Sequence, residues 1–175
     1  MSLPVPYDLG PMPTGRTMTT VDEQLVRAPL ARIFALAADV ERWPSLLPHY
    51  RYVRYIERRP DGGGIVEMSA NRPFGLVQWP TWWRSRMRVY RPGAALVPAV
   101  RFSHEAGVTK GMEVEWTFQE VAGGTHVRIV HAWNGPPVPM VGELAASMVI
   151  GPVFVHGIAS RTLAGLAASA ERSGA

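Results

Sequence analysis

Two histidines occur in segments where apolar and aromatic side chains alternate with polar ones. His131 falls on the same side of its segment as Trp133, and His104 on the same side as Phe102. An imidazole titrates at ~6.5 and burial lowers that pKa, so either ring could act as a general acid or base near neutral pH. His156, in the last segment of the chain, could join them. The alternative is that these histidines are hydrogen-bonded core residues, and the sequence leaves both interpretations open.

These histidines do not predict a metal site. Their spacing does not resemble a helical histidine pair, and no carboxylate is clearly directed to the same place. The chain has no cysteine, which removes cysteine-ligated zinc, disulfides and thiol catalysis together. The glycine run 62–64 is typical of a turn and does not resemble a phosphate-binding loop. We therefore expect neither a metal nor a nucleotide cofactor.

Alternation also indicates which residues face the interior of a sheet. Side chains in a strand point to its two sides in turn, so an inward residue recurs at every second position. The predicted inward residues in two of the clearest segments are Met112, Val114, Trp116 and Phe118, and Trp83, Ser85, Met87 and Val89. The same rule places Arg84, Arg86 and Arg88 on the outer, solvent-facing side.

The segment 140–172 predicts the one long helix of the chain. The residues of its apolar face, among them Met148, Val155, Ile158 and Thr162, recur at steps of three and four positions, so this face needs a large apolar partner. At ~1.5 Å per residue the helix would extend roughly 45 Å. Gly151 and Pro152 predict a kink or a short break. Its longest run without a charged residue or a histidine is twelve residues, short of the ~20 that a membrane span needs.

Strands dominate the rest of the chain. Residues 1–17 form an arm that is rich in proline and glycine and shows no periodicity. The expected elements that follow are a strand over 19–27, a helix from Pro29, a short helix over 40–46 that Asp39 caps, and strands over 50–59, 65–71, 82–90, 99–106, 112–121 and 125–134. The looser stretch between 71 and 82, with Pro73 and Pro80, is expected to be a loop. Residues 18–172 are predicted to form a single α+β domain.

Composition narrows the class of protein. A chain of 175 residues with 47% hydrophobic and 18% charged residues is typical of one globular domain with a sizeable core. No export signal is recognisable, so a cytoplasmic location is the default. The net charge of +4 comes mainly from clustered arginines, but no aromatic-interleaved motif accompanies them, so we expect no nucleic-acid partner. Apolar residues of the arm could contact a neighbouring chain, so a homodimer is one possible assembly.

The order of elements is that of a helix-grip fold, in which a curved seven-stranded antiparallel sheet wraps around one long C-terminal helix. Four segments, 26–29, 39–50, 115–118 and 123–125, resemble the polyketide cyclase/dehydrase and lipid-transport family of the START-like, Bet v 1-like superfamily. The resemblance covers about Thr19 to Arg172. It implies a cavity between the sheet and the long helix that holds lipids, sterols, polyketides or other hydrophobic molecules.

The resemblance also implies candidate catalytic residues. In aromatase/cyclases of this family, a tyrosine and an arginine in the cavity orient a poly-β-ketone for aldol closure and dehydration. Tyr50 matches the tyrosine by its position after the Trp-Pro pair. The arginine would be Arg86, which alternation places outside, so that only a register shift or a bulge would turn it inward. As the sequence stands, it departs from the catalytic pattern at this position.

The leading interpretation is therefore a protein that binds a hydrophobic small molecule, polyketide-, lipid- or aromatic-like, inside a helix-grip domain. The predicted ligand-binding residues are Trp43, Trp83, Ser85, Met87, Phe102, His104, Trp116, Phe118, Trp133, Met148, Val155 and His156. The first alternative is a true aromatase/cyclase that uses Tyr50, His131 and Arg86. The second alternative is a protein-interaction or chaperone-like domain whose core is filled.

Overall fold

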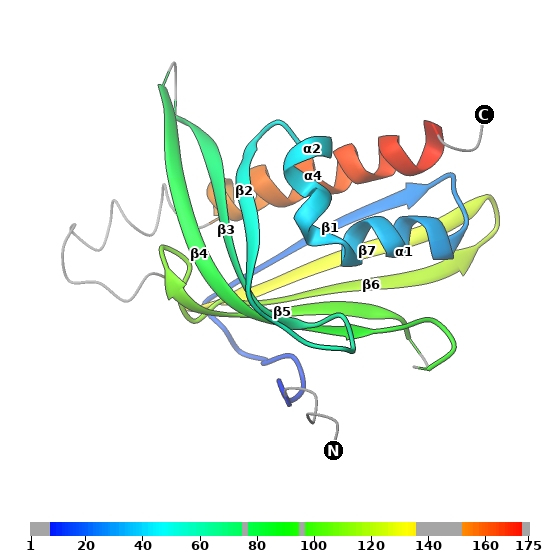
Figure 1. Cartoon of the computed structure of the whole chain (residues 1–175), viewed down its shortest axis with the longest axis horizontal. Coiled ribbons are helices and arrows are strands. Elements are labelled where there is room, and N and C mark those ends of the chain that lie inside the picture. The colour runs from blue at the N-terminus through cyan, green and yellow to red at the C-terminus, as the bar shows by residue number, and fades with distance from the viewer. Residues whose placement is uncertain (1–7, 75–76, 95–96, 136–151, 173–175) are drawn as a thin grey trace.

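The computed structural model of the chain describes residues 8–74, 77–94, 97–135 and 152–172. Seven antiparallel strands form one sheet, in the order β1-β7-β6-β5-β4-β3-β2. The strands are β1 (Met18–Val26), β2 (Tyr50–Arg58), β3 (Gly64–Phe74), β4 (Val77–Tyr90), β5 (Ala99–Gly107), β6 (Glu113–Val121) and β7 (Gly124–Trp133). Figure 1 shows that the sheet is curved and that the helices lie together on its inner side. The predicted helix-grip architecture is confirmed.

Strands β3 and β4 extend into the stretch that the sequence predicted to be a loop. Pro73 and Pro80 suggested the break, yet both lie within the paired strands. β2 pairs with β3 only as far as Ala70, and β5 pairs with β4 only from Trp83 onward, so each proline has a neighbouring strand on one side alone. A proline lacks a backbone donor and is tolerated at such a free edge. The hairpin therefore projects beyond the rest of the sheet (Figure 1).

The helices between β1 and β2 differ in detail from the prediction. They are α1 (Leu30–Ala38), a 3-10 turn η1 (Val40–Arg42) and α2 (Trp43–Leu46). Pro29 is the capping residue before α1 rather than its first helical residue, and the Asp39 side chain makes no capping hydrogen bond. The predicted second helix is thus split, because its first turn takes the tighter 3-10 geometry.

The described part of the long helix is α4 (Pro152–Arg172), which runs across the inner face of the sheet (Figure 1). Its predicted first part, residues 140–151 with Met148 and Gly151, lies outside the described residues. Leu47 approaches α4 so closely at Gly165 that a side chain there would collide with it. In the described ranges, no helix has the length and hydrophobicity to cross a membrane.

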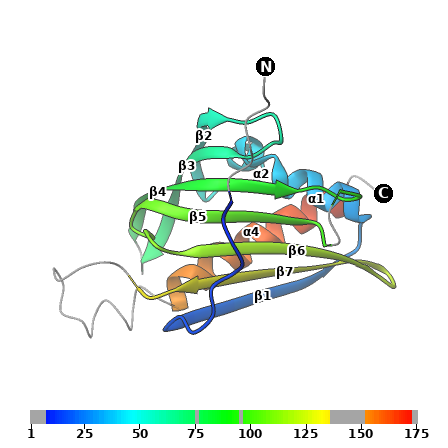
Figure 2. The same cartoon turned by 90° about the horizontal axis from the view of Figure 1, so that it is seen from below.

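The described arm residues, 8–17, cross the outer face of the sheet, opposite the helices (Figure 2). Arg101 on β5 points to this face, yet only 3% of its side chain is exposed. Its guanidinium donates to the carbonyl of Gly10 and pairs with Glu113 at 3.2 Å and with Glu115 at 3.8 Å. The arm is therefore packed against the domain at this point. Residues 1–7, which hold most of the apolar side chains that could contact a neighbour, lie outside the described residues.

Candidate functional site

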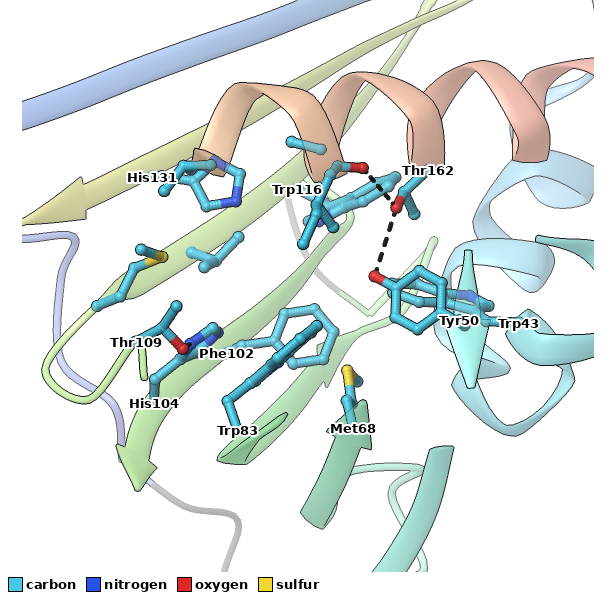
Figure 3. A pocket seen from close by; sticks show the side chains of 15 residues that line it. Trp43, Tyr50, Met68, Trp83, Phe102, His104, Thr109, Trp116, His131 and Thr162 are labelled. Atoms are coloured by element: carbon cyan, nitrogen blue, oxygen red, sulfur yellow. Dashed lines mark hydrogen bonds between the residues drawn. The ribbon is translucent and has the colours of Figure 1, made fainter. Parts of the chain in front are cut away.

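A cavity of about 70 Å³ lies between the inner face of the sheet and α4. The 15 residues of its wall are Trp43, Tyr50, Met68, Trp83, Phe102, His104, Thr109, Met112, Val114, Trp116, His131, Val155, Ile158, Ala159 and Thr162. Figure 3 shows these side chains converging from the strands and from the first turns of α4. A single buried water needs roughly 10–15 Å³, so the space holds several water-sized groups. The core beside α4 is therefore not filled.

The wall is mostly flat and apolar. The Trp43 ring packs against Tyr50, Phe102 and Trp116, with ring centroids between 5.3 and 6.3 Å apart. Its Nε1 donates to the carbonyl of Leu36 at 3.0 Å, which fixes the ring in place. No arginine, lysine, aspartate or glutamate belongs to the described wall. Such a surface favours an apolar ligand of flat shape, because aromatic rings supply large area in fixed orientations.

Tyr50 places one hydroxyl group on this wall, from the first position of β2. The hydroxyl oxygens of Tyr50 and Thr162 are 3.4 Å apart, and His49 Nε2 lies 3.1 Å from the same threonine oxygen. Burial raises the pKa of Tyr50 well above its usual value, with only partial compensation by the hydrogen bond to Thr162. The phenol therefore stays protonated and can donate a hydrogen bond to a ligand. It cannot supply a phenolate base near neutral pH.

His104 lies on the wall with one ring nitrogen already bonded. Its Nδ1 is 2.6 Å from the hydroxyl of Thr109, and its ring stacks on Trp83 with centroids 6.1 Å apart and an interplanar angle of 11°. Burial, with a smaller contribution from His131, lowers the pKa of His104 to about 3. The imidazole is therefore neutral at physiological pH.

His131 on β7 is the least satisfied polar group of the wall. Burial lowers its pKa to about 3, so this ring is also neutral. Its Nδ1 is buried and has no hydrogen-bond partner. A neutral imidazole has one donor and one acceptor nitrogen, so His131 can bind a ligand group of either kind. As a base it is weak, because a pKa near 3 is far from the operating pH that general base catalysis needs.

The structure brings together many of the residues that the sequence singled out. Those on the cavity wall are Trp43, Tyr50, Trp83, Phe102, His104, Trp116, His131 and Val155. Trp133 reaches only a small adjoining chamber, where its Nε1 donates to the carbonyl of Lys110. Ser85 and Met87 are buried on the inner side of β4 but do not reach the wall. Met148 lies outside the described residues.

Three further predicted site residues do not reach the cavity, each for a geometric reason. Arg86 points to the outer face, is 43% exposed and pairs with Glu105 at 3.5 Å. The register shift between β4 and β5 falls at Arg84 and Ser85 and does not turn Arg86 inward. Phe118 lies inside the domain but packs edge-on against Phe34 of α1, with centroids 5.2 Å apart.

His156 is the third of these residues. Adjacent helical positions are about 100° apart, so His156 turns away from the cavity while Val155 faces it. Its side chain is 64% exposed, and its Nδ1 lies 2.6 Å from the buried carboxylate of Asp22 on β1. Burial raises the pKa of Asp22, with partial compensation by His156. His156 thus ties α4 to the edge strand rather than serving the cavity.

Several wall residues were not among the predicted site residues. They are Met68, Thr109, Met112, Val114, Ile158, Ala159 and Thr162. Alternation had already placed Met112 and Val114 inside, and helical periodicity had placed Thr162 on the apolar face of α4, so those signals were present. Thr109 gave no such signal, since it lies in the turn after β5. Among the described residues, no group of three potential ligands could hold a metal ion.

Known proteins share both the sequence pattern and the fold of this chain. A family model described as polyketide cyclase / dehydrase and lipid transport matches residues 26–154. A protein from Thermus thermophilus is similar with a TM-score of 0.71 and 17% identity, over 90% of this chain and 100% of its own. The Zhui aromatase/cyclase from a Streptomyces species is similar with a TM-score of 0.64 and 18% identity, over 89% and 94% of the two chains.

A START superfamily protein from Mycobacterium smegmatis has a TM-score of 0.65 and 12% identity, over 88% of this chain and 97% of its own. Identities this low show a shared fold and nothing about the reaction or the ligand. The family match, in contrast, rests on the sequence itself and spans most of the chain, from the end of β1 into α4.

Proposed function

Because this chain belongs to the polyketide cyclase / dehydrase and lipid transport family, we propose that its cavity binds one hydrophobic small molecule. The observation that carries the proposal is the wall, which lies between the sheet and α4, is rich in aromatic rings and has no charged side chain among its described residues. Burial of apolar ligand surface contributes roughly 25 cal/mol per Å². Tyr50, His104 and His131 supply a few polar groups that would orient the ligand.

The experiment uses the tryptophans of the wall as reporters. Trp82 and Trp83 are neighbours on β4, but Trp83 lines the cavity whereas Trp82 is 45% exposed on the other side. A hydrophobic probe such as an anthracene should change the tryptophan fluorescence of the wild type. We expect Trp83→Phe to remove a large part of that change and Trp82→Phe to leave it in place. Equal signals from the two variants would place the probe elsewhere on the molecule.

Native mass spectrometry of the protein purified from its own host provides the second arm. A small molecule that co-purifies and is released on unfolding would support the proposal and identify the ligand. If the measured mass is that of the chain alone and no hydrophobic probe changes the tryptophan fluorescence, the proposal is overturned.

Cyclisation of a poly-β-ketone is the second candidate, favoured by the presence of Tyr50 and His131 on one wall. Aldol closure requires stabilisation of a developing enolate, for which preorganised positive charge or donors are most effective. Arg86 is held on the outer face by Glu105, and the His131 imidazole is a weak base. We therefore propose binding without turnover. Incubation with a short poly-β-ketone should return it unchanged, and a cyclised product lost in Tyr50→Phe would favour the enzyme instead.

We also propose that the protein has no nucleic-acid partner, because arginines on the outer face are paired with carboxylates. Arg54 pairs with Glu67 at 2.6 Å, and Arg84 and Arg86 share Glu105. Carboxylates thus neutralise part of the positive charge on this face. A homodimer stays a prediction, which sedimentation of the full chain and of a chain without residues 1–7 would test.

A further inference from the structure

The cavity has hydrogen-bonding groups at two opposite ends, with aromatic rings between them. Figure 3 shows Tyr50 and Thr162 together at one end and His131 at the other, where α4 begins. Phe102 and Trp116 lie between the two ends. A ligand that fills the cavity lengthwise therefore meets polar groups at both of its ends and apolar surface in the middle.

The Tyr50 end has a hydroxyl group that the protein holds only by a long contact. Thr162 has one hydroxyl proton, and its oxygen lies 2.8 Å from the carbonyl of Ile158 in the preceding turn of α4. The contact from Thr162 to Tyr50 is longer, at 3.4 Å, and hydrogen bonds between hydroxyl groups are usually shorter than ~3.0 Å. The Tyr50 hydroxyl is thus only weakly engaged by the protein.

The His131 end holds two polar atoms without partners. His131 Nδ1 and Thr20 Oγ1 are both buried and make no hydrogen bond. They sit at directly paired positions, Thr20 on β1 and His131 on β7. Both line a side chamber of about 10 Å³, which shares Met112, His131 and Val155 with the main cavity. Buried polar atoms without partners are rare in native proteins and call for a ligand, a water or a functional role.

We propose that the ligand is a neutral molecule with an apolar, ring-containing middle and a hydroxyl or carbonyl group at each end, one bound by Tyr50 and the other by His131 with Thr20. This inference rests on the proposed function, since it specifies the ligand class of the same cavity. A hydroxyl group suits the His131 end best, because it can donate to the ring nitrogen and accept from Thr20 at once. The side chamber is the size of one oxygen atom with its proton, so a ligand with a rigid and bulky group at this end is excluded.

The neutrality of the ligand follows from the wall. No described wall residue carries a permanent charge, and both wall histidines are neutral, with pKa values of about 3. A carboxylate or phosphate buried here would lack a counter-charge and would bear the full free-energy penalty of leaving water. A fatty acid or a phosphorylated lipid therefore fits this wall poorly, whereas a neutral ring compound fits it well.

Four probes of matched shape test the inference. They are a naphthalene with methyl groups at its two ends, the analogue with one methyl replaced by hydroxyl, the analogue with both replaced, and a hydroxy-naphthoate. Titration calorimetry on the full chain should show affinity rising roughly two- to tenfold with each hydroxyl, the gain of one neutral hydrogen bond. The naphthoate should bind at least tenfold more weakly than the dihydroxy probe.

Substitutions at the two ends of the cavity show which end binds each hydroxyl group of the probe. Tyr50→Phe should remove the gain in affinity from one hydroxyl, and Thr20→Val should reduce the gain from the other, because the hydrogen bond to His131 Nδ1 remains. In the double variant the dihydroxy probe should keep only that remaining part of the gain over the dimethyl probe. Thr20→Val is nearly isosteric, so it tests the His131 end even where His131→Phe fails to fold. Arg86→Gln, on the outer face, is the matched control and should keep both gains.

The outcomes separate this inference from the function on which it rests. Equal binding of the dimethyl and dihydroxy probes would leave the cavity as a hydrophobic site and overturn the two-ended ligand, with a water molecule then satisfying His131 and Thr20. Tighter binding of the naphthoate would overturn the neutral class. No binding of any probe would overturn the proposed function and this inference together.

Discussion

Protonation of His104, which is buried, and of His131, which is partly buried on the cavity wall, should destabilise the fold as the pH falls. His104 and His131 have folded-state pKa values of about 3, whereas an exposed histidine in the unfolded chain titrates at about 6.5. The folded state therefore favours the neutral rings. This contribution to stability is fully present above pH 6.5 and is lost as the pH falls from there toward 3, because only the unfolded chain takes up the protons.

The size of the loss between pH 7 and pH 5 follows from proton uptake by the unfolded chain. Over this interval an unfolded histidine gains most of one proton, and a folded one with a pKa near 3 gains almost none. The linkage relation then gives a loss of about 2 kcal/mol per histidine, or about 4 kcal/mol for the pair. The result hardly depends on the folded pKa as long as it stays below about 4, because the folded ring then remains neutral throughout the interval.

Urea unfolding of the wild type, His131→Phe and His104→Gln at pH 7 and pH 5 measures this loss. Each variant should lose about 2 kcal/mol less than the wild type between the two pH values. Met112→Ala removes a non-titrating side chain from the same wall and serves as the control. It should lower the free energy of unfolding at both pH values and leave their difference unchanged. If His131→Phe and the wild type lose the same amount, the histidine is not buried as neutral and the reasoning fails.

Three other substitutions test separate parts of the structure. Asp22→Asn should raise the free energy of unfolding at pH 7 and lose that advantage as the pH falls, because burial raises the pKa of Asp22 and disfavours its charged form; urea unfolding at pH 7 and pH 4 measures both effects. Gly165→Ala should destabilise in thermal melts, because the steric cost against Leu47, about 1–3 kcal/mol, exceeds the gain of up to about 1 kcal/mol in helix propensity. Arg101→Met should release the arm and speed tryptic cleavage at Arg16, since it removes the contact to Gly10.

Matched variants define what would contradict these expectations. Arg84→Met removes an exposed arginine from the same face and should leave arm cleavage at the wild-type rate. Equal cleavage in the Arg84 and Arg101 variants would show that the arm is held by other contacts. Gly157→Ala adds a methyl group to α4 where nothing lies within 4 Å, so it should stabilise where Gly165→Ala destabilises.

The sequence predicted the fold and the inward faces well, because both depend on local periodicity. Trp116 and His131 were placed on the interior by alternation alone, and both reach the cavity. The prolines at 73 and 80 led to a wrong prediction of a loop, because a proline interrupts a strand only where that strand is hydrogen-bonded to neighbouring strands on both sides. Whether a strand has a free edge depends on the arrangement of the whole sheet and cannot be read from a local sequence pattern.

Which residues line the cavity was harder to predict, because a side chain can point into the interior of the domain without reaching the cavity. Phe118 and Met87 are inside the domain, but α1 and neighbouring side chains cover them before α4 does. Thr109 reaches the wall from a turn, where side-chain direction depends on backbone geometry rather than on period. His156 differs from Val155 by one position, and without the helix register relative to the sheet the two cannot be told apart.

The position of charge is the observation behind our proposal that the cavity binds its ligand without turnover. An enolate intermediate is stabilised by preorganised positive charge or hydrogen-bond donors, and the described wall has no charged side chain, so that only neutral donors such as Tyr50 are available. The arginines of β4 are on the opposite face of the same strand, where Glu105 pairs with two of them. A one-residue shift of β4 that brought Arg86 inside would also turn Trp83, Ser85 and Met87 outward. The observed register keeps Trp83 on the cavity wall and leaves Arg86 on the outer face.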